Sequence, residues 1–238
     1  MLGVDPFTLI PFGFFFVVAG IFVLVIVIAV HQWKAKKRRR EGMATWAMSR
    51  GMTFVPEDKA MPTRFDFALF ERGDGRGCDN VATGTWEGTE VHLADYWYYD
   101  ESRDSDGSRS RSYRRFSVAV LRIDAVVPAV RIERETVFSR LADHVGFRDI
   151  EFESEEFNRR FDIRSPDRQF AFKLIDGRMI EWLLHAAGPQ CFEVSGPWLL
   201  AYSGQVAPEH LPTLLSAATA FVDHIPRLVW ADYGKASS

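Results

Sequence analysis

Cysteine, glycine and proline are scarce in this chain. The 238 residues include two cysteines, 17 glycines and 11 prolines. These numbers exclude a disulfide-stabilised scaffold, a collagen-like repeat and a Pro/Gly-rich disordered protein. Apolar residues make up 47% of the chain, which is enough for one sizeable hydrophobic core.

The chain as a whole lacks a basic character, with a formal net charge of -3. The charge is unevenly distributed, because residues 1–40 carry one acidic residue, Asp5, against six basic ones. The remaining 198 residues hold 23 Lys and Arg against 31 Asp and Glu. Nucleic-acid-binding modules need a basic surface for phosphate contacts, so this acidic body argues against a nucleic-acid partner.

Sequence motifs for catalysis are also absent. There is no Gly-x-Ser-x-Gly elbow, no His-Glu-x-x-His and no dinucleotide-binding fingerprint. Cys78 and Cys191 lie far apart and lack metal-ligand spacing, so we expect two unpaired thiols in a reducing compartment. The sequence therefore predicts no catalytic residue, no cofactor and no metal site, and we lean against an enzyme.

One long apolar run is present near the amino terminus. No charged residue occurs from Pro6 to Val30, and about 20 helical residues suffice to cross a hydrocarbon core of roughly 30 Å. A cleaved signal peptide would have basic residues before a shorter apolar run, whereas here they follow a longer one. We predict a single-pass transmembrane helix that contacts the bilayer through residues 9–31.

The basic cluster follows this run directly and indicates its orientation. Lys and Arg next to a membrane span tend to stay on the cytoplasmic side. We therefore expect the amino terminus outside and the globular part in the cytoplasm, with residues 1–40 as the anchor and 41–238 as one domain. Anionic lipid headgroups are an expected partner of the cluster, although setting the topology alone would explain it. Its members are Lys34, Lys36, Lys37, Arg38, Arg39 and Arg40.

Residue patterns in the soluble part predict an α+β fold. The first helix should continue to Arg50 and stop at Gly51. Strand-like and helix-like patterns then alternate irregularly, without βαβ units, which favours a mixed and mainly antiparallel sheet with several packing helices. The strands are predicted at 53–56, 65–70, 80–86, 90–98, 116–123, 130–133, 149–153 and 157–164, with a hairpin formed by 191–194 and 198–202. The helices are predicted at 136–144, 165–175, 179–187 and 211–225, with turns at 87–88 and 176–177.

Several short motifs resemble those of a family of actinobacterial single-pass membrane proteins of unknown function. Less closely, they are similar to a wider bacterial membrane family that also lacks a known function. A proline is usual in that pattern where this chain has Gly177. The resemblance implies topology and fold and supplies no catalytic residue. The matching motifs are the span with its basic run, Arg72-Gly73, Asn80-Val81, Gly84, residues 149–153, residues 157–161, Asp167 with Ala171, and Arg178-Met179 before Glu181.

Three side-chain groups could suggest ligand binding but have simpler explanations. Glu181 and His185 are four apart on a predicted helix, which is half of a metal site or an ordinary surface pair. The acidic residues of 151–156 lack the glycine of a calcium loop and fit a solvated strand edge. The glycines of residues 73–77 resemble a phosphate loop, but no helix or Lys-Ser/Thr follows, so a flexible turn is favoured.

The most distinctive segment is residues 95–115, in which aromatic residues lead into a polar, arginine-rich loop. Aromatic residues and arginine are enriched in binding hot spots. A mobile hairpin tip with aromatics packed on the strands is the simpler interpretation. The predicted interaction surface comprises Trp97, Tyr99, Arg109, Arg111 and Arg114.

The sequence thus predicts a membrane-anchored cytoplasmic domain that serves as a protein-interaction or scaffolding module with an unidentified protein partner. The alternative is a hydrolytic or small-molecule-binding domain whose site is assembled from residues distant in sequence. A flat aromatic and arginine surface would favour the former, and a deep pocket with clustered titratable groups would favour the latter.

Overall fold

A computed structural model describes residues 6–103, 107–134 and 150–234, with side chains from Val18 onward. Contacts divide the chain into two units, Met1–Gly42 and Met43–Ser238, each of which is described by itself. The predicted helix at 136–144 lies outside the described residues.

Helix α1 (Pro6–Met48) contains the apolar run. It ends at Met48, two residues before the predicted end at Arg50. The predicted stop at Gly51 is confirmed, since the amides of Arg50 and Gly51 donate to the carbonyls of Ala47 and Met48, and Gly51 has a φ of 69°. A positive φ of this size suits glycine, which has no Cβ to clash with the backbone. By length and composition, α1 can cross a membrane once.

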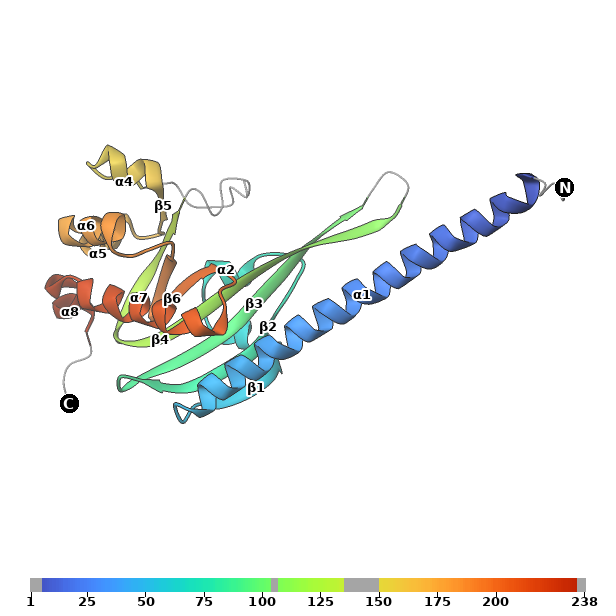
Figure 1. The fold of residues 1–238 in the computed structure, drawn as a ribbon. Coiled ribbons are helices and arrows are strands. Elements are labelled where there is room, and N and C mark those ends of the chain that lie inside the picture. Colours follow the sequence, from blue (N-terminus) through green and yellow to red (C-terminus); the bar gives the residue numbers. More distant parts are fainter. Residues whose placement is uncertain (1–5, 104–106, 135–149, 235–238) are drawn as a thin grey trace. The chain divides into compact units, whose positions relative to one another are not determined.

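A six-stranded antiparallel sheet forms the body of the second unit (Figure 1). It contains the long strand β4 (Arg109–Arg134), which pairs along one edge with β3 (Thr89–Arg103) and β5 (Phe161–Arg164). The other edge of β4 pairs with β6 (Cys191–Gly204). Strand β2 (Gly75–Trp86) lies between β3 and β1 (Thr53–Asp58). The predicted turn at residues 87–88 is confirmed, since both have positive φ angles.

Each face of the sheet is covered by different helices, and the predicted α+β fold is confirmed. Val91, Leu121 and Leu199 point to the face covered by the longer helices, among them α7 (Leu211–His224). Tyr96 and Val120 point to the opposite face, which a short segment covers. That segment contains η1 (Met61–Arg64) and α2 (Ala68–Glu71). The remaining helices are α4 (Glu155–Arg160), α5 (Arg168–Leu174), α6 (Gly177–His185), η2 (Pro208–His210) and α8 (Arg227–Tyr233).

Two predicted strands between residues 149 and 164 are mostly wrong. Residues 150–153 form no strand, and residue 149 lies outside the described part. Residues 157–160 belong to helix α4, because the hydroxyl of Ser154 accepts from the amide of Phe157 at 3.2 Å. Acidic residues lie in the first turn of α4 and basic residues in the last, an arrangement that the helix dipole favours. The cap and these charges together outweigh the alternation of apolar and polar residues that predicted a strand.

The predicted strand at 65–70 is wrong because distant residues organise this segment. Both carboxylate oxygens of Glu193, on β6, accept from the first amides of α2, those of Ala68 (2.7 Å) and Leu69 (3.1 Å). Asp58 accepts from the amide of Met61 at the start of η1. Caps that come from another element leave no local signal in the sequence.

The predicted hairpin at 191–202 is a single bent strand, β6. Gly196 has a φ of 54°, and the β4–β6 register shifts between Arg122 and Val130. A bulge of this kind bends a strand without reversing it. Helix α5 begins later than predicted, because Asp167 rather than Ser165 caps it by accepting from the amide of Phe170.

Candidate functional site

The segment predicted as a polar loop is a paired two-stranded arm. Strands β3 and β4 stay in register from Tyr99 opposite Tyr113 to Arg103 opposite Arg109. The hydroxyls of Ser102 and Ser110 lie 2.8 Å apart across the pair. Residues 104–106 lie outside the described part, so the arm is described up to this gap.

The arm brings four of the five predicted surface residues to one face of the sheet. In the antiparallel register, Tyr99 lies opposite Tyr113, and Trp97 lies opposite Arg115. Side chains two residues apart on a strand share a face, so Arg109 and Arg111 lie on this side as well. The fifth residue, Arg114, lies opposite Tyr98 on the other face, and its Nε is 3.9 Å from Asp100. We call Trp97, Tyr99, Tyr113, Arg109, Arg111 and Arg115 the aromatic–arginine face.

Three aromatic rings form the centre of this face. The Trp97 and Tyr99 rings are stacked at 6.4 Å with an interplanar angle of 11°, and Tyr113 lies 5.3 Å from Tyr99. The guanidinium of Arg111 lies 4.7 Å from the Tyr99 ring centroid, within cation–π range. Tyr113 remains 49% exposed. The sequence prediction did not include Tyr113 or Arg115, which a hairpin register extended through residue 115 would have identified.

Glycines on β2 make room for these rings. Gly75 and Gly77 lie opposite Tyr99 and Trp97. A Cβ at Gly75 would be 2.5 Å from ring atoms of Tyr99, and one at Gly77 would be 2.9 Å from Cζ2 of Trp97. The flexible turn predicted here holds only for Gly73, which has a φ of 75°. The other two glycines have a packing role, since their missing side chains let the rings lie flat across the strand.

The arginines of the face form loose ion pairs. Glu101 lies 3.5 Å from Arg109 and 3.8 Å from Arg111, and Asp79 lies 3.9 Å from Arg115. The side chains of Arg109 and Arg111 are 61% and 51% exposed. Exposed pairs of this length contribute little to stability, so a binding partner can displace them at small cost.

A buried ionic cluster lies at the opposite face, where α2 packs. Arg72 donates to Glu133 at 2.7 Å, and the hydroxyl of Tyr202 donates to the same oxygen at 2.8 Å. Arg131 lies 3.6 Å from the second oxygen of Glu133. Burial and then the Glu133 charge raise the pKa of the Glu193 carboxyl to about 7. The cluster ties the α2 segment to β4 and β6, and no local pattern in the sequence indicated it.

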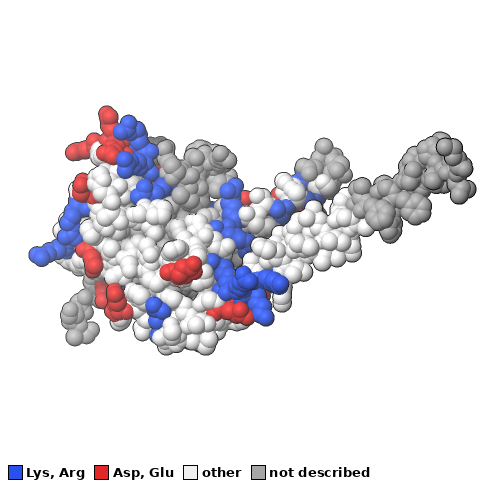
Figure 2. Space-filling model, in the orientation of Figure 1, with Lys and Arg blue, Asp and Glu red and all other residues white. Residues whose placement is uncertain are grey.

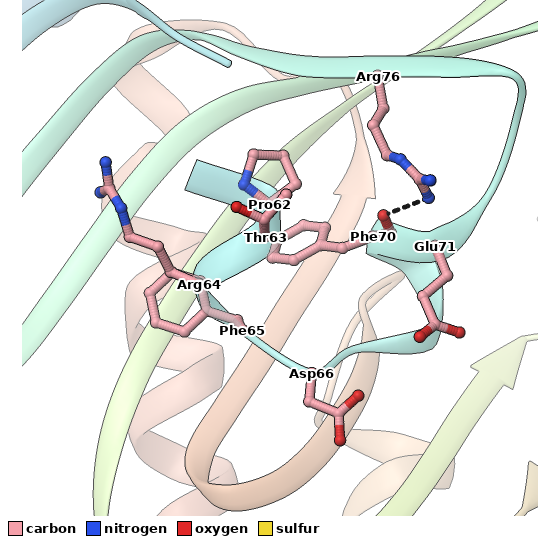
Figure 3. A pocket seen from close by; sticks show the side chains of 8 residues that line it. All are labelled: Pro62, Thr63, Arg64, Phe65, Asp66, Phe70, Glu71 and Arg76. Atoms are coloured by element: carbon pink, nitrogen blue, oxygen red, sulfur yellow. Dashed lines mark hydrogen bonds between the residues drawn. The ribbon is translucent and has the colours of Figure 1, made fainter. Parts of the chain in front are cut away.

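An open pocket of about 370 Å³ lies beside the same segment. Phe65 and Phe70 line its middle, while Arg64 and Arg76 lie on opposite sides (Figure 3). Arg76 donates to the carbonyl of Phe70 at 2.8 Å, and Arg64 pairs with Asp58 at 2.6 Å. The charged groups around this pocket do not converge on one point.

The other groups considered in the sequence do not assemble a metal site. Glu181 and His185 form an exposed pair at 3.6 Å, and both cysteines are buried and free. Glu155 and Glu156 lie in the first turn of α4 rather than on a strand edge. Within residues 6–103, 107–134 and 150–234, no cluster of three His, Cys, Asp or Glu side chains suits a metal ion.

The predicted basic cluster lies on α1 beyond the apolar run, and Figure 2 shows it as one dense group of Lys and Arg. Lys37 lies 3.8 Å from Glu41 and 5.5 Å from the Trp33 ring centroid. Acidic and basic side chains are interspersed elsewhere on the visible face. The sharp contrast between apolar run and basic cluster is typical of the end of a membrane span.

No protein-family model and no curated protein matches this chain. Among solved structures, it is similar to the mycobacterial trehalose monomycolate transport factor A, TtfA. The TM-score is 0.58 at 16% sequence identity, with 80% of this chain and 96% of that chain covered. At this identity the similarity establishes a shared fold. Mycobacteria are actinobacteria, which agrees with the actinobacterial part of the resemblance, while the family remains a prediction.

Proposed function

We propose that this protein is a membrane-anchored binding factor whose α+β domain docks onto a protein partner through the aromatic–arginine face. The observation that supports this proposal most directly is the group of Trp97, Tyr99 and Tyr113 rings among exposed arginines. Stacked aromatics lose little conformational freedom on binding, and arginine adds directional hydrogen bonds. The two glycines opposite the rings make room for them, which favours a binding surface over an ordinary hairpin tip.

The partner in this proposal belongs to a lipid-transport apparatus. One solved structure with a similar fold is that of a trehalose monomycolate transport factor, and this chain has a helix that can anchor it at a membrane. A factor without chemistry of its own would act by holding or positioning a transporter. The fold similarity supports this role by analogy, and the aromatic–arginine face provides a surface through which such a partner can bind.

In the proposed topology, the domain is cytoplasmic and the amino terminus is outside. The support is the group of Lys and Arg directly after the apolar run. Reporters fused after Ser238 test it in the native host. A reporter active only in the cytoplasm is the expected result, and activity of an exterior reporter would reverse the orientation.

Site-specific photo-crosslinking in cells tests the binding face. A photoreactive amino acid at Tyr113, which is 49% exposed, should give one dominant crosslinked product. The matched control is Val126, which is 57% exposed on the same strand and distant from the arm. We expect the product from position 113 to disappear when Trp97→Ala is added. Equal products from both positions, or a product that survives Trp97→Ala, would contradict the proposal.

The pocket beside η1 supports the second candidate, a small-molecule-binding or hydrolytic domain. Its aromatic centre, with Arg64 and Arg76 beside Asp66 and Glu71, could hold a small polar ligand. A ligand that co-purifies with the wild-type chain and is lost in Arg76→Ala would favour this alternative. An unchanged small-molecule extract would remove it.

A further inference from the structure

One stretch of β4 has a backbone edge without a strand partner among the described residues. Strand β3 pairs with β4 from Arg109 to Leu121, whereas β6 pairs along the other edge only from Phe116 to Ile132. The last residue of β6, Gly204, lies opposite Phe116. The outer edge of residues 109–115 therefore continues the line of β6 with alternating amide and carbonyl groups.

This edge lacks the proline that two of the sheet's other outer strands contain, whereas the short outer strand β5 has none. Strand β1 contains Pro56 and β6 contains Pro197. Proline removes an amide donor and blocks strand addition, which protects natural sheet edges from pairing with other chains. Residues 109–115 contain no proline, so every backbone amide there is present.

The charges on the edge select the kind of strand that can bind. Four of its seven residues are arginines, so a second copy of the edge would place arginine against arginine. The carboxylates that neighbour these arginines come from the inner side of the sheet, on β3 and β2. An incoming acidic strand would approach from the opposite side and add charge-assisted hydrogen bonds.

We propose that the edge formed by residues 109–115 binds an extended acidic segment of the partner protein, which adds to β4 as a further strand beyond Gly204. This inference rests on the proposed function and names the partner's chemistry. Seven residues span roughly 23 Å of strand. Backbone pairing supplies affinity, and Asp or Glu at alternate positions of the segment faces Arg109, Arg111 and Arg115. A lipid surface offers acidic headgroups but cannot complete the hydrogen-bond ladder.

The test uses the full chain in phosphatidylcholine nanodiscs and a nonapeptide of alternating Glu and Thr as the probe. A second peptide has the same charges but is N-methylated at every residue, which removes its backbone donors on both edges. We expect the N-methylated peptide to bind at least tenfold more weakly. Hydrogen exchange should slow at residues 109–115 only with the unmodified peptide. Equal binding of both peptides would overturn strand addition.

Charge variants complete the test. Arg109→Glu with Arg111→Glu should weaken binding of the unmodified peptide at least tenfold. The matched control, Arg159→Glu with Arg227→Glu, changes the net charge equally at exposed positions on α4 and α8 and should stay within twofold. An equal loss in the control would overturn the inference.

Lipid docking is the remaining outcome. Slowed exchange in the arm in phosphatidylglycerol nanodiscs, with no response to the peptide, would overturn the inference in favour of a membrane surface. If the peptide fails while the crosslink from position 113 persists, strand addition is wrong and the proposed function stands. If both fail, the proposed function falls as well.

Discussion

Replacing Glu193 with glutamine should change how the stability of the domain depends on pH. Glu193 is 3% exposed, and its carboxyl oxygens accept from the amides of Ala68 and Leu69 at 2.7 and 3.1 Å. Burial, followed by the charge of Glu133, raises its pKa from an ordinary 4.5 to about 7. Native Glu193 therefore holds a proton at pH values where the unfolded chain has released it.

The sign and size of the effect follow from proton linkage. Between pH 4.5 and 7 the native state binds more protons at Glu193 than the unfolded state, so this group's contribution to the free energy of unfolding falls as pH rises. A pKa difference of about 2.5 corresponds to on the order of 3 kcal/mol. Glu193→Gln does not titrate. Its free energy of unfolding, relative to wild type, should therefore rise by about this amount between pH 4.5 and 8.

Urea titrations measure this difference across the pH range. They use the full chain in a nonionic detergent, with unfolding monitored by tryptophan fluorescence. Glu153→Gln, at an exposed position, is the control and should show a constant difference from wild type. A pH-independent difference between Glu193→Gln and wild type would refute the account of a buried, proton-binding carboxyl.

Three further predictions concern the buried ionic cluster, the glycines opposite the aromatic rings, and the cysteines. Arg72→Met leaves Glu133 buried without its 2.7 Å partner and should cost about 3 kcal/mol of unfolding free energy, whereas Arg64→Met at an exposed pair should cost less than about 1 kcal/mol. Equal losses in urea titrations would contradict this. A Cβ at Gly77 would lie 2.9 Å from the Trp97 ring, so Gly77→Val should displace this ring and weaken the position-113 crosslink at least tenfold. The circular dichroism spectrum should be retained. An unchanged crosslink would contradict the packing role of Gly77. Both thiols are fully buried and burial raises the pKa of each, so a maleimide at pH 8 should label the chain only after denaturation; labelling of the native chain would contradict their burial.

Local patterns predicted the elements that local forces determine. The apolar run, the stop at Gly51 and the stripe of α7 were readable because periodicity and a single glycine specify them. Segments organised by distant residues were not readable. The clearest case is residues 65–70, where Glu193, more than 120 positions away, supplies the cap for α2.

The candidate site was predicted in its composition but not in its geometry. Trp97 and Tyr99 were identified by residue type, yet the segment after them was expected to be a loop. A strand register through residue 115 separates Arg114 from the other arginines and brings in Tyr113. Serine- and arginine-rich segments carry no strand signal of their own, since pairing with the partner strand provides it.

Binding of a protein partner by the aromatic–arginine face can be measured directly. The most direct measurement is the dissociation constant between the full chain and the partner crosslinked at position 113, for wild type and Trp97→Ala. We predict that Trp97→Ala weakens binding about 30-fold or more, as for a hot-spot tryptophan. Phe172→Ala, at an aromatic residue 43% exposed on α5, should change it within twofold. An unchanged dissociation constant for Trp97→Ala would contradict binding through this face.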